Sequence, residues 1–573
     1  MYKRQVLNFL KDFNDKQISA LIKKAKKDGD LILLSIACER ILLSGSLVKV
    51  KKFFSEKQIK ELKKKSPLIN IRSADGNNKR LHSKWVALFR ENIVFHRELP
   101  LSDATGLPLI CTGECSVKRE PGLSVEDLHH RYQGNSRPIN FSIDKTIETA
   151  LCCLKNAGVI LKEEMRHESS LSPFALLRQW KFDIDVENSR NVFHLSGEQT
   201  SYGKGLTLEH ARVSLTMEIV ERCSAFAPVD SNGIDGFVKE YPLFYGSYQD
   251  IVSKNNMAVN PDELAMEIQY GNEPIYWMEG ETIGKKVRQD EVIVKRDTGT
   301  GEDAVELNNN GTGGSRLNDK LKERCEKKDK NTLKKIFVPV QSVFLFSNLD
   351  EVDLFSGIGS TGFASGNTME HAKVAALLEI IERHQEAVVP FEISRCFRLV
   401  VEDREKNRDL AVLLESYYSL GIDLQFQDIT PEYGVPCCKC FVTGTDGTIY
   451  KGTAASLNAK KAIISAITET NYPFPNSPVS EKGPDDLIIV GFENLPDYST
   501  GDYASDLALL EHVLVSNGFR PIYIDLTRKD IGLPVVKAVI PGMDIIGDFD
   551  EFSRVHPELF QNYLKLNSKL FSV

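Results

Sequence analysis

The sequence predicts an α/β or α+β protein in which one unit occurs twice and follows a mainly helical extension. Two segments align without a gap, GLTLEHARVSLTMEIVER at residues 205–222 and GNTMEHAKVAALLEIIER at residues 366–383. Strand-like runs at 191–195 and 337–345 precede them. A chain of 573 residues exceeds one ordinary compact core, so we expect a large duplicated domain plus an extension.

The N-terminal extension, residues 1–125, is predicted to be helical over residues 1–65. Apolar residues recur there at helical spacing, as at Ile18 and Ile22, and the lysine-rich runs are interpreted as solvated helix faces. Residues 66–125 have a mixed pattern with short strand-like runs. The sequence assigns no chemistry to this extension.

An α/β pattern covers residues 130–548. It begins with a predicted helix over residues 145–159, which ends at Gly158. A segment rich in Gly, Asn, Asp and Lys at 296–330 separates the two copies, and we expect it to be a mobile surface loop. Residues 549–573 form a tail in which a short amphipathic helix is expected.

Composition limits the class of protein. The net charge of −8 and the pI of about 5.9 argue against a nucleic-acid coat or a membrane-surface binder. No apolar run approaches the roughly 18 residues that span a bilayer, and no signal peptide is recognised, so a cytoplasmic location is expected. Eleven irregularly spaced cysteines are interpreted as free thiols, and the group Cys437, Cys438 and Cys440 as part of a strand.

Both copies of the repeated segment end in a pair of glutamates three residues apart. The pairs are Glu218 with Glu221 and Glu379 with Glu382. Carboxylate oxygens at this spacing on a helix suit Mg²⁺, which binds a few carboxylates together with substrate phosphates. The duplicated pairs therefore predict two half-sites that face one metal-bound nucleotide.

The residues around these pairs support the same interpretation. Residues 203–205 (Gly-Lys-Gly) and 365–367 (Ser-Gly-Asn) are expected to be flexible turns whose amides can bind phosphate. Small residues on the glutamate stripe, such as Ala211 and Ala372, are expected to leave room for a ligand. The alternative is that Glu-x-x-Glu-Arg only forms surface ion pairs along a helix. Duplication between apolar flanks favours the ligand site.

This arrangement resembles the YcaO family over roughly residues 130–548. The matching elements are MEIVER at 217–222, LEIIER at 378–383, a third helix that ends in Ala-Ile-Thr-Glu469, and the segments that begin at Leu533 and Ile540. The resemblance implies a duplicated YcaO-like domain with a pseudo-symmetric ATP cleft and with ATP and Mg²⁺ as cofactors. It also implies phosphorylation of a peptide-bond oxygen that leads to a thioamide or an azoline.

The resemblance assigns residues to ATP and to magnesium but names no catalytic residue. The residues matched to ATP are Arg137, Thr146, Lys204, Ser214, Asn367 and Arg383. Those matched to Mg²⁺ are Glu218, Glu221, Glu379, Glu382 and Glu469. One departure is Ser465, which stands where the family usually carries arginine. Losing a charge-assisted bidentate contact would weaken triphosphate binding.

Thioamide formation is preferred over azoline formation, because Tyr132–Arg137 resembles the opening motif of thioamide-forming members and C-terminal prolines are absent. A peptide or protein substrate, a TfuA-like or other partner protein and a homodimer are expected, without nucleic acid or membrane. The alternatives are a non-catalytic YcaO-like subunit that binds a leader peptide or partner, an accessory factor for ribosomal-protein methylthiolation, and a scaffold whose glutamates form structural salt bridges.

Overall fold

The structure is a computed structural model of the whole chain. It describes residues 10, 13–43, 47–63, 79–110, 122–133, 141–188, 191–230, 232–264, 270–283, 333–347, 349, 351–352, 354–355, 359–544, 549 and 555–569. The loop expected at 296–330 lies outside these residues, as does Arg137. Among the described residues, no helix is both long enough and apolar enough to cross a membrane.

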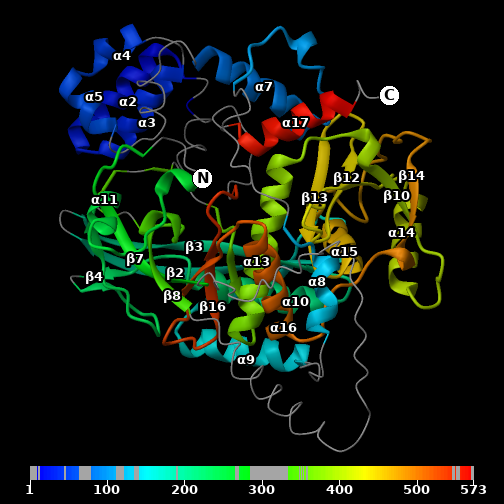
Figure 1. Cartoon of the computed structure of the whole chain (residues 1–573). Helices are drawn as coiled ribbons and strands as arrows, with labels where there is room; N and C mark the ends of the chain where they lie inside the picture. The colour runs from blue at the N-terminus through cyan, green and yellow to red at the C-terminus, as the bar shows by residue number, and fades with distance from the viewer. Residues whose placement is uncertain are drawn as a thin grey trace, which may run out of the picture.

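A helical unit at one end of the molecule confirms the expectation for the described part of residues 1–65 (Figure 1). Its helices are α2 (Asp15–Asp28), α3 (Leu31–Leu43), α4 (Leu47–Phe53) and α5 (Glu56–Lys63). Asn14 caps α2 by accepting hydrogen bonds from two backbone N–H groups, and Gly29 ends it with φ of 70°. The helices enclose a core of their own that includes Ile18 and Ile22.

The strand-like runs expected within 66–125 are wrong for the part that the structure describes. Residues 79–110 instead hold helix α7 (Lys79–Phe95) and a short 3₁₀ helix, η2 (Asp103–Thr105). Trp85, Phe89 and Ile93 recur every four residues, and they pack against helix α17 (Pro557–Lys569) and the C-terminal end of α13. Helix α17 is the short helix that the sequence predicted for the tail. The packing of these apolar side chains against α13 and α17 therefore stabilises residues 79–95 as a helix.

The end of α7 is tied to the segment that follows α13 (Met369–Val388). The Asn92 side chain donates to the carbonyl of Phe391 at 2.9 Å and accepts from its N–H at 2.8 Å. The His96 ring stacks on the Phe391 ring, with centroids 4.2 Å apart. Part of the N-terminal extension is thus packed into the body of the protein.

The described strands form three sheets. The first contains β1 (Ile160–Arg166), β2 (Phe174–Asn188), β3 (Asn191–Gly205), β4 (Val229–Asp230) and β5 (Gly233–Ile234). The second contains β6 (Phe244–Gly246), β7 (Ile275–Ile283), β8 (Leu333–Pro339), β9 (Phe363–Ser365), β15 (Ile522–Asp525) and β16 (Val535–Val539). The third has the order β13-β12-β11-β10-β14 and contains β10 (Cys396–Val400), β11 (Gln425–Asp428), β12 (Cys437–Thr443), β13 (Ile449–Ala455) and β14 (Ile488–Gly491).

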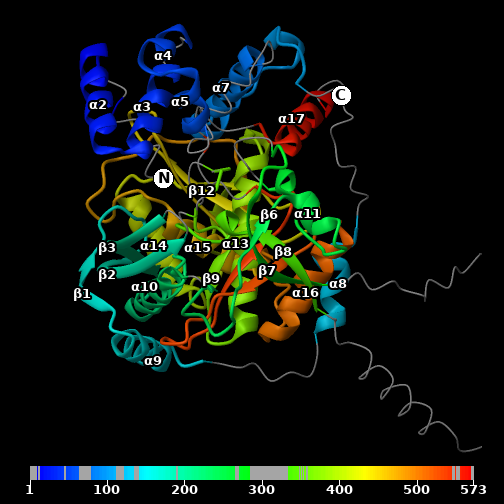
Figure 2. The ribbon, with the colours of Figure 1, turned by 90° about the vertical axis from the view of Figure 1, so that its left-hand side faces the viewer.

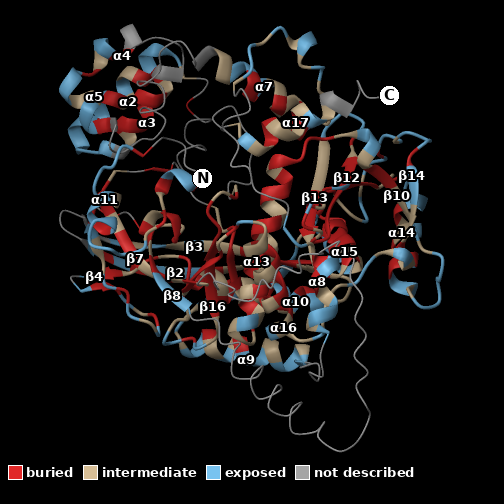
Figure 3. Cartoon of the chain, in the orientation of Figure 1, coloured by how far each residue is buried: buried red, intermediate tan, exposed pale blue. Residues whose placement is uncertain are grey.

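Helices cover these sheets and separate them (Figure 2). The helices not yet introduced are α8 (Val125–Tyr132), α9 (Ile143–Asn156), α10 (Leu208–Cys223), α11 (Tyr248–Val252), η3 (Pro261–Glu263), η4 (Val340–Ser342), η5 (Ile393–Arg395), α14 (Arg408–Ser419), α15 (Ala459–Glu469), η6 (Phe492–Asn494) and α16 (Tyr503–Ser516). Buried residues concentrate where α10, α13 and α15 meet the sheets (Figure 3). The mixed helix and sheet fold agrees with the predicted fold class.

The predicted duplication is present as a strand followed by a helix that packs back on it. β3 leads into α10 and β9 leads into α13, and threonine caps both helices through its side-chain oxygen, Thr207 in the first and Thr368 in the second. A third unit of the same kind, β13 followed by α15, is capped by Asn458. The three helices lie in three different hydrophobic clusters.

The expectation of a flexible Gly-Lys-Gly turn is wrong, because residues 203–205 are the last residues of β3. A Cβ at Gly203 would lie 2.1 Å from the Ala211 carbonyl oxygen, so strand and helix backbones are in contact there. A Cβ at Gly366 would similarly lie 2.6 Å from the N atom of Ala372. The small residues Ala211 and Ala372 are fully buried, and they make room for the chain's own backbone.

Other local expectations are met with shifted boundaries. The helix expected over 145–159 is α9, and Gly158 follows it with φ of 75°. The strand expected over 337–345 ends at Pro339, and a 3₁₀ helix follows. The cysteine-rich segment is strand β12, in which Cys437, Cys438 and Cys440 are buried.

We expect Gly203→Ala to destabilise the fold by about 2 kcal/mol or more, because the new methyl group would overlap backbone atoms of α10. The midpoint of thermal unfolding measures this. Gly359→Ala is the matched control, since among the described residues other than its chain neighbours its added Cβ comes within 4 Å of the Thr361 Oγ1 alone, at 4.0 Å. Equal midpoints for the two variants would contradict the close contact.

Candidate functional site

Three helices bring glutamates to one region. Each of α10, α13 and α15 carries a glutamate eleven residues after its N-cap: Glu218 (207 + 11), Glu379 (368 + 11) and Glu469 (458 + 11). Because the helices start from equivalent strand ends, equal spacing brings the three side chains to corresponding positions. Sequence reasoning found the three glutamates but missed that the third unit repeats the first two in structure.

The first pair is held by the chain's own donors. Glu218 accepts a hydrogen bond from the Tyr202 N–H at 2.8 Å, and Arg222 lies 3.4 Å from its other oxygen. Arg222 also contacts Glu221 at 2.8 Å. Burial raises the pKa of Glu218, and it raises that of Glu221 to about 8, with Glu379 adding to the rise and Arg222 opposing it. The ion pair of the alternative interpretation therefore forms, but between partly buried side chains that are 15% to 24% exposed.

The second pair has the same kind of environment. Glu379 accepts a hydrogen bond from the Gly362 N–H at 3.0 Å, and burial raises its pKa. Glu382 accepts one from the Thr453 hydroxyl at 3.2 Å and lies 3.4 Å from Arg383. Burial raises the pKa of Glu382 to about 8, and the neighbouring carboxylates contribute to the rise while Arg383 opposes it. The two pairs act on each other electrostatically across α10 and α13.

One turn beyond the second pair lies Glu386, which the sequence interpretation missed. Burial alone would raise its pKa, but Lys451 at 2.8 Å and Arg383 at 3.3 Å hold it at about 2. Thr453 also donates to it at 3.2 Å. The sequence did contain a signal for Glu386, because it lies seven residues after Glu379 and so on the same helix face as Glu379 and Glu382.

Two buried lysines near these carboxylates were also missed. Lys537 of β16 donates to the Thr361 carbonyl at 2.6 Å, and Lys439 of β12 donates to the Gln427 side chain at 3.3 Å. Burial lowers the pKa of each to about 8, although Glu379 and Glu221 oppose the shift at Lys537. A lysine inside an apolar run, as in LPVVKAVIP, is the sequence signal for such a residue.

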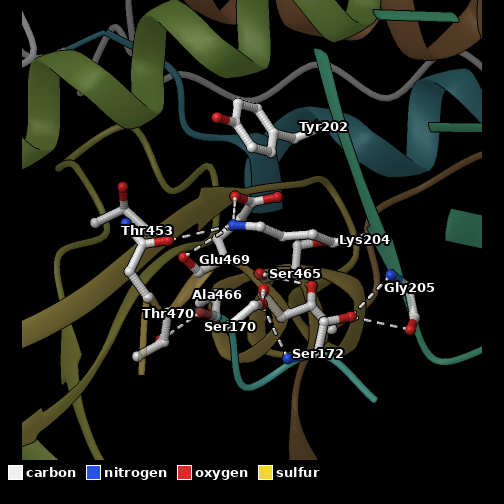
Figure 4. Close-up of polar contacts among 12 residues, drawn as sticks. Ser170, Ser172, Tyr202, Lys204, Gly205, Thr453, Ser465, Ala466, Glu469 and Thr470 are labelled. Carbon is white, nitrogen blue, oxygen red and sulfur yellow. Dashed lines mark hydrogen bonds and ion pairs between the residues drawn. The ribbon is translucent and has the colours of Figure 1, made fainter. Parts of the chain in front are cut away.

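Lys204 links β3 to the third helix (Figure 4). Its ammonium lies 2.8 Å from a carboxylate oxygen of Glu469, and the Lys204 side chain is 9% exposed. Glu469 is 51% exposed and contributes to the raised pKa values of both Glu218 and Glu382. It therefore couples the two halves. Ser465, one turn earlier on α15, is exposed.

Other predicted residues lie on the same elements. The Thr146 hydroxyl of α9 and the Asn367 amide that precedes α13 are hydrogen bonded at 3.1 Å, although they are far apart in sequence. Ser214 is exposed one turn before Glu218 on α10. The structure thus brings Thr146 into contact with Asn367 and Lys204 into contact with Glu469. Arg137 lies outside the described residues.

The cluster combines six carboxylates, at Glu218, Glu221, Glu379, Glu382, Glu386 and Glu469, with six cations, at Lys204, Arg222, Arg383, Lys439, Lys451 and Lys537. In the described part of the chain, no three acidic, histidine or cysteine side chains already converge closely enough to hold a metal ion. Chain donors such as Arg222 and the Tyr202 N–H occupy carboxylate oxygens instead. The metal role of the predicted glutamates therefore stays a prediction.

Comparison with known sequences agrees with the sequence resemblance. A family model described as YcaO cyclodehydratase, ATP- and Mg²⁺-binding, matches residues 325–477 and 470–544. These segments contain α13, α15 and β16 with their glutamates and Lys537. An uncharacterized protein of Methanothermobacter thermautotrophicus is 27% identical over 242 residues, which cover 36% of this chain and 62% of that protein.

Solved structures that are similar to this chain include a heterocyclase and a YcaO protein. A heterocyclase in complex with substrate and cofactor has 19% identity and a TM-score of 0.48, with 73% of this chain and 55% of that chain covered. The YcaO protein of Methanopyrus kandleri bound with AMPPCP and Mg²⁺ has 18% identity and a TM-score of 0.43, with 70% and 91% covered.

We expect the free energy of unfolding of the metal-free protein to fall between pH 6.5 and 8. Glu221 and Glu382 have folded-state pKa values of about 8 against an ordinary 4.5, so the folded state binds more protons and its advantage is lost as the pH rises. Each carboxyl contributes up to about 1.4 kcal/mol per pH unit. The window starts at pH 6.5 because of His96, whose pKa burial lowers from 6.5 to about 2. Below pH 6.5 the unfolded state protonates this histidine and the folded state does not, so His96 makes the free energy of unfolding rise with pH there.

Chemical denaturation at several pH values in a chelator measures this slope. Glu382→Gln should flatten it, because glutamine resembles the protonated carboxyl at every pH. Glu370→Gln, at an exposed position in the first turn of the same helix, should keep the slope of the unchanged protein. The same slope in all three proteins would show that Glu382 does not carry a raised pKa.

Proposed function

We propose that this chain, whose residues 325–544 match the YcaO family model, binds MgATP at the glutamates of α10, α13 and α15 and uses it to activate a peptide bond. ATP and Mg²⁺ are the cofactors of this family. The observation that carries the proposal is that three equivalent strand–helix units place their glutamates near enough to raise one another's pKa values. Such a group of buried anions is costly unless cations compensate it.

The donor set fits magnesium. All the predicted ligands are carboxylate oxygens, which are the ligands that Mg²⁺ prefers. The raised pKa values of Glu221 and Glu382 reflect buried negative charge that a divalent cation would relieve. In this proposal Glu218 and Glu221 hold metal on one side and Glu379 and Glu382 on the other. Glu469 approaches from the third helix.

The remaining predicted residues would hold the nucleotide. Lys204 and Arg383 place positive charge beside the carboxylates, where it would also stabilise phosphate charge. The hydrogen-bonded pair of Thr146 and Asn367 offers neutral polar groups from α9 and the start of α13. MgATP supplies the phosphoryl group. The peptide oxygen bonds to the γ-phosphorus as the bond to the bridging oxygen breaks, and ADP leaves.

The activated carbonyl carbon would then accept a sulfur or hydroxyl nucleophile, and phosphate would depart. We retain thioamide formation as the first choice and azoline formation as the second, for the sequence reasons given above. Mass spectrometry of a co-expressed candidate peptide separates them, since one product exchanges oxygen for sulfur and the other loses water. We also propose 130–548 as the ATP-binding domain, 1–125 as its extension and 549–573 as the tail.

A non-catalytic YcaO-like subunit that binds a leader peptide or partner is the second candidate function. The observation that favours it is Ser465, because an exposed serine cannot replace the bidentate contact of an arginine to phosphate. Lys204 of β3 places a cation next to Glu469, which lies one turn after Ser465 on α15. This nearby cation favours the enzymatic proposal. Metal-dependent ATP binding and ADP release separate the two candidates.

We expect Glu382→Gln to lower the affinity for MgATP by tenfold or more, about 1.4 kcal/mol, because one charged oxygen ligand is lost. Glu469→Gln should lower it less, since Glu469 is half exposed and already pairs with Lys204. Calorimetric titration measures the affinity, and release of ADP with a candidate peptide measures turnover. Glu370→Gln serves as the control on α13. Unchanged binding in Glu382→Gln would contradict the proposed metal site.

A further inference from the structure

The N-terminal helical unit differs in charge from the rest of the chain. Residues 1–65 contain 17 lysines and arginines against 7 aspartates and glutamates, a net charge of +10. Since the whole chain carries −8, the other 508 residues carry −18. A segregation of this size directs charged partners to one part of a surface.

The lysines of α2 are at the surface of this unit. On α2, Lys16 and Lys23 are exposed, and the ion pair between Lys51 and Glu56, at 3.6 Å, joins side chains that are 63% and 87% exposed. An exposed pair of this kind contributes little to folding. The Lys51–Glu56 pair is therefore not explained by the stability of the unit.

An open hollow of about 420 Å³ lies on the same unit. Its lining residues are Asp15, Lys16, Ser19, Ala20, Lys23 and Phe53. Ser19 and Lys23 of α2, four residues apart, share a helix face, and Phe53 comes from the end of α4. The hollow is thus lined by the apolar residues Ala20 and Phe53 and by the basic residues Lys16 and Lys23.

We propose that this hollow binds an acidic segment of the peptide or protein substrate, an inference that rests on the proposed function. An apolar side chain of the segment would contact Ala20 and Phe53, and flanking carboxylates would pair with Lys16 and Lys23. The unit stands beside α7, at the end of the molecule toward which α13 runs (Figures 1 and 2). Binding there would raise the local concentration of the residue to be modified.

A short acidic polypeptide fits this surface better than a nucleic acid. The basic unit is small and is joined to a body of charge −18, which would repel a long polyanion that extends beyond the unit. An apolar contact on Phe53 suits a leucine-like side chain flanked by glutamates.

Fluorescence anisotropy with the full-length protein tests the proposal. The probe is a labelled peptide of repeated Glu-Leu-Glu-Glu units, compared with a Gln-Leu-Gln-Gln peptide and an oligouridylate of equal length. We expect the acidic peptide to bind most tightly. Replacing both Lys16 and Lys23 by glutamate should weaken its binding roughly tenfold.

The matched control replaces Lys57 and Lys60 of α5, which are also exposed, by glutamate. It changes the net charge by the same amount at residues that do not line the hollow, so we expect the affinity for the acidic peptide to fall by less than about threefold. Equal losses in both double variants, equal binding of the glutamine peptide, or tighter binding of the oligouridylate would each overturn the proposal. Circular dichroism confirms that both variants fold.

Calorimetry with MgATP separates this proposal from the function it rests on. The variant with Lys16 and Lys23 replaced should bind MgATP as the unchanged protein does, because neither lysine belongs to the glutamate cluster. If MgATP binds but the acidic peptide does not, the hollow is not the docking site while the proposed function stands. If the peptide binds but MgATP does not, the proposed function fails instead.

Discussion

The structure depends on the neutralisation of buried carboxylates. Glutamates from three helices lie close to one another between the sheets, and all but the half-exposed Glu469 are largely withdrawn from solvent. Arginines that follow the glutamates on the same helices, Arg222 and Arg383, oppose the cost, and Lys204 and Lys537 reach in from strands β3 and β16. The pKa of Glu221 is still raised to about 8, so this compensation is incomplete. A protein keeps such an arrangement for a cationic ligand more readily than for stability.

Glycine contacts between strand and helix set the positions of these glutamates. A Cβ at Gly203 would overlap α10, and one at Gly452 would lie 2.4 Å from the Ala466 carbonyl oxygen of α15. Each helix is therefore packed directly on the backbone of the strand that precedes it. This close packing fixes where the carboxyl end of each helix lies, and with it the convergence of Glu218 and Glu469.

Much of this could be predicted from the sequence, because the repeated segment carries its caps, apolar stripe and glutamates in one continuous stretch. The contacts of Lys204 could not, since its partner Glu469 is 265 residues away and the surrounding glycines suggest a turn. Glu386 and Lys537 were missed for a related reason. Their charge is significant only once burial and distant partners are known, and neither is visible in a local pattern.

The two halves are equivalent in backbone but not in charge. At an offset of 161 residues, Glu386 of the second copy corresponds to Ala225 of the first (386 − 161 = 225), which is fully buried. Lys451 and Arg383 hold the pKa of Glu386 at about 2, so the second copy keeps a permanent ion-pair network that the first copy lacks at this position. Arg383 is thereby oriented from two sides, by Glu382 and by Glu386. Arg222 of the first copy pairs instead with Glu218 and Glu221, so the two arginines lie in different charge environments. Halves that differ in this way suit a single asymmetric ligand better than two identical metal sites.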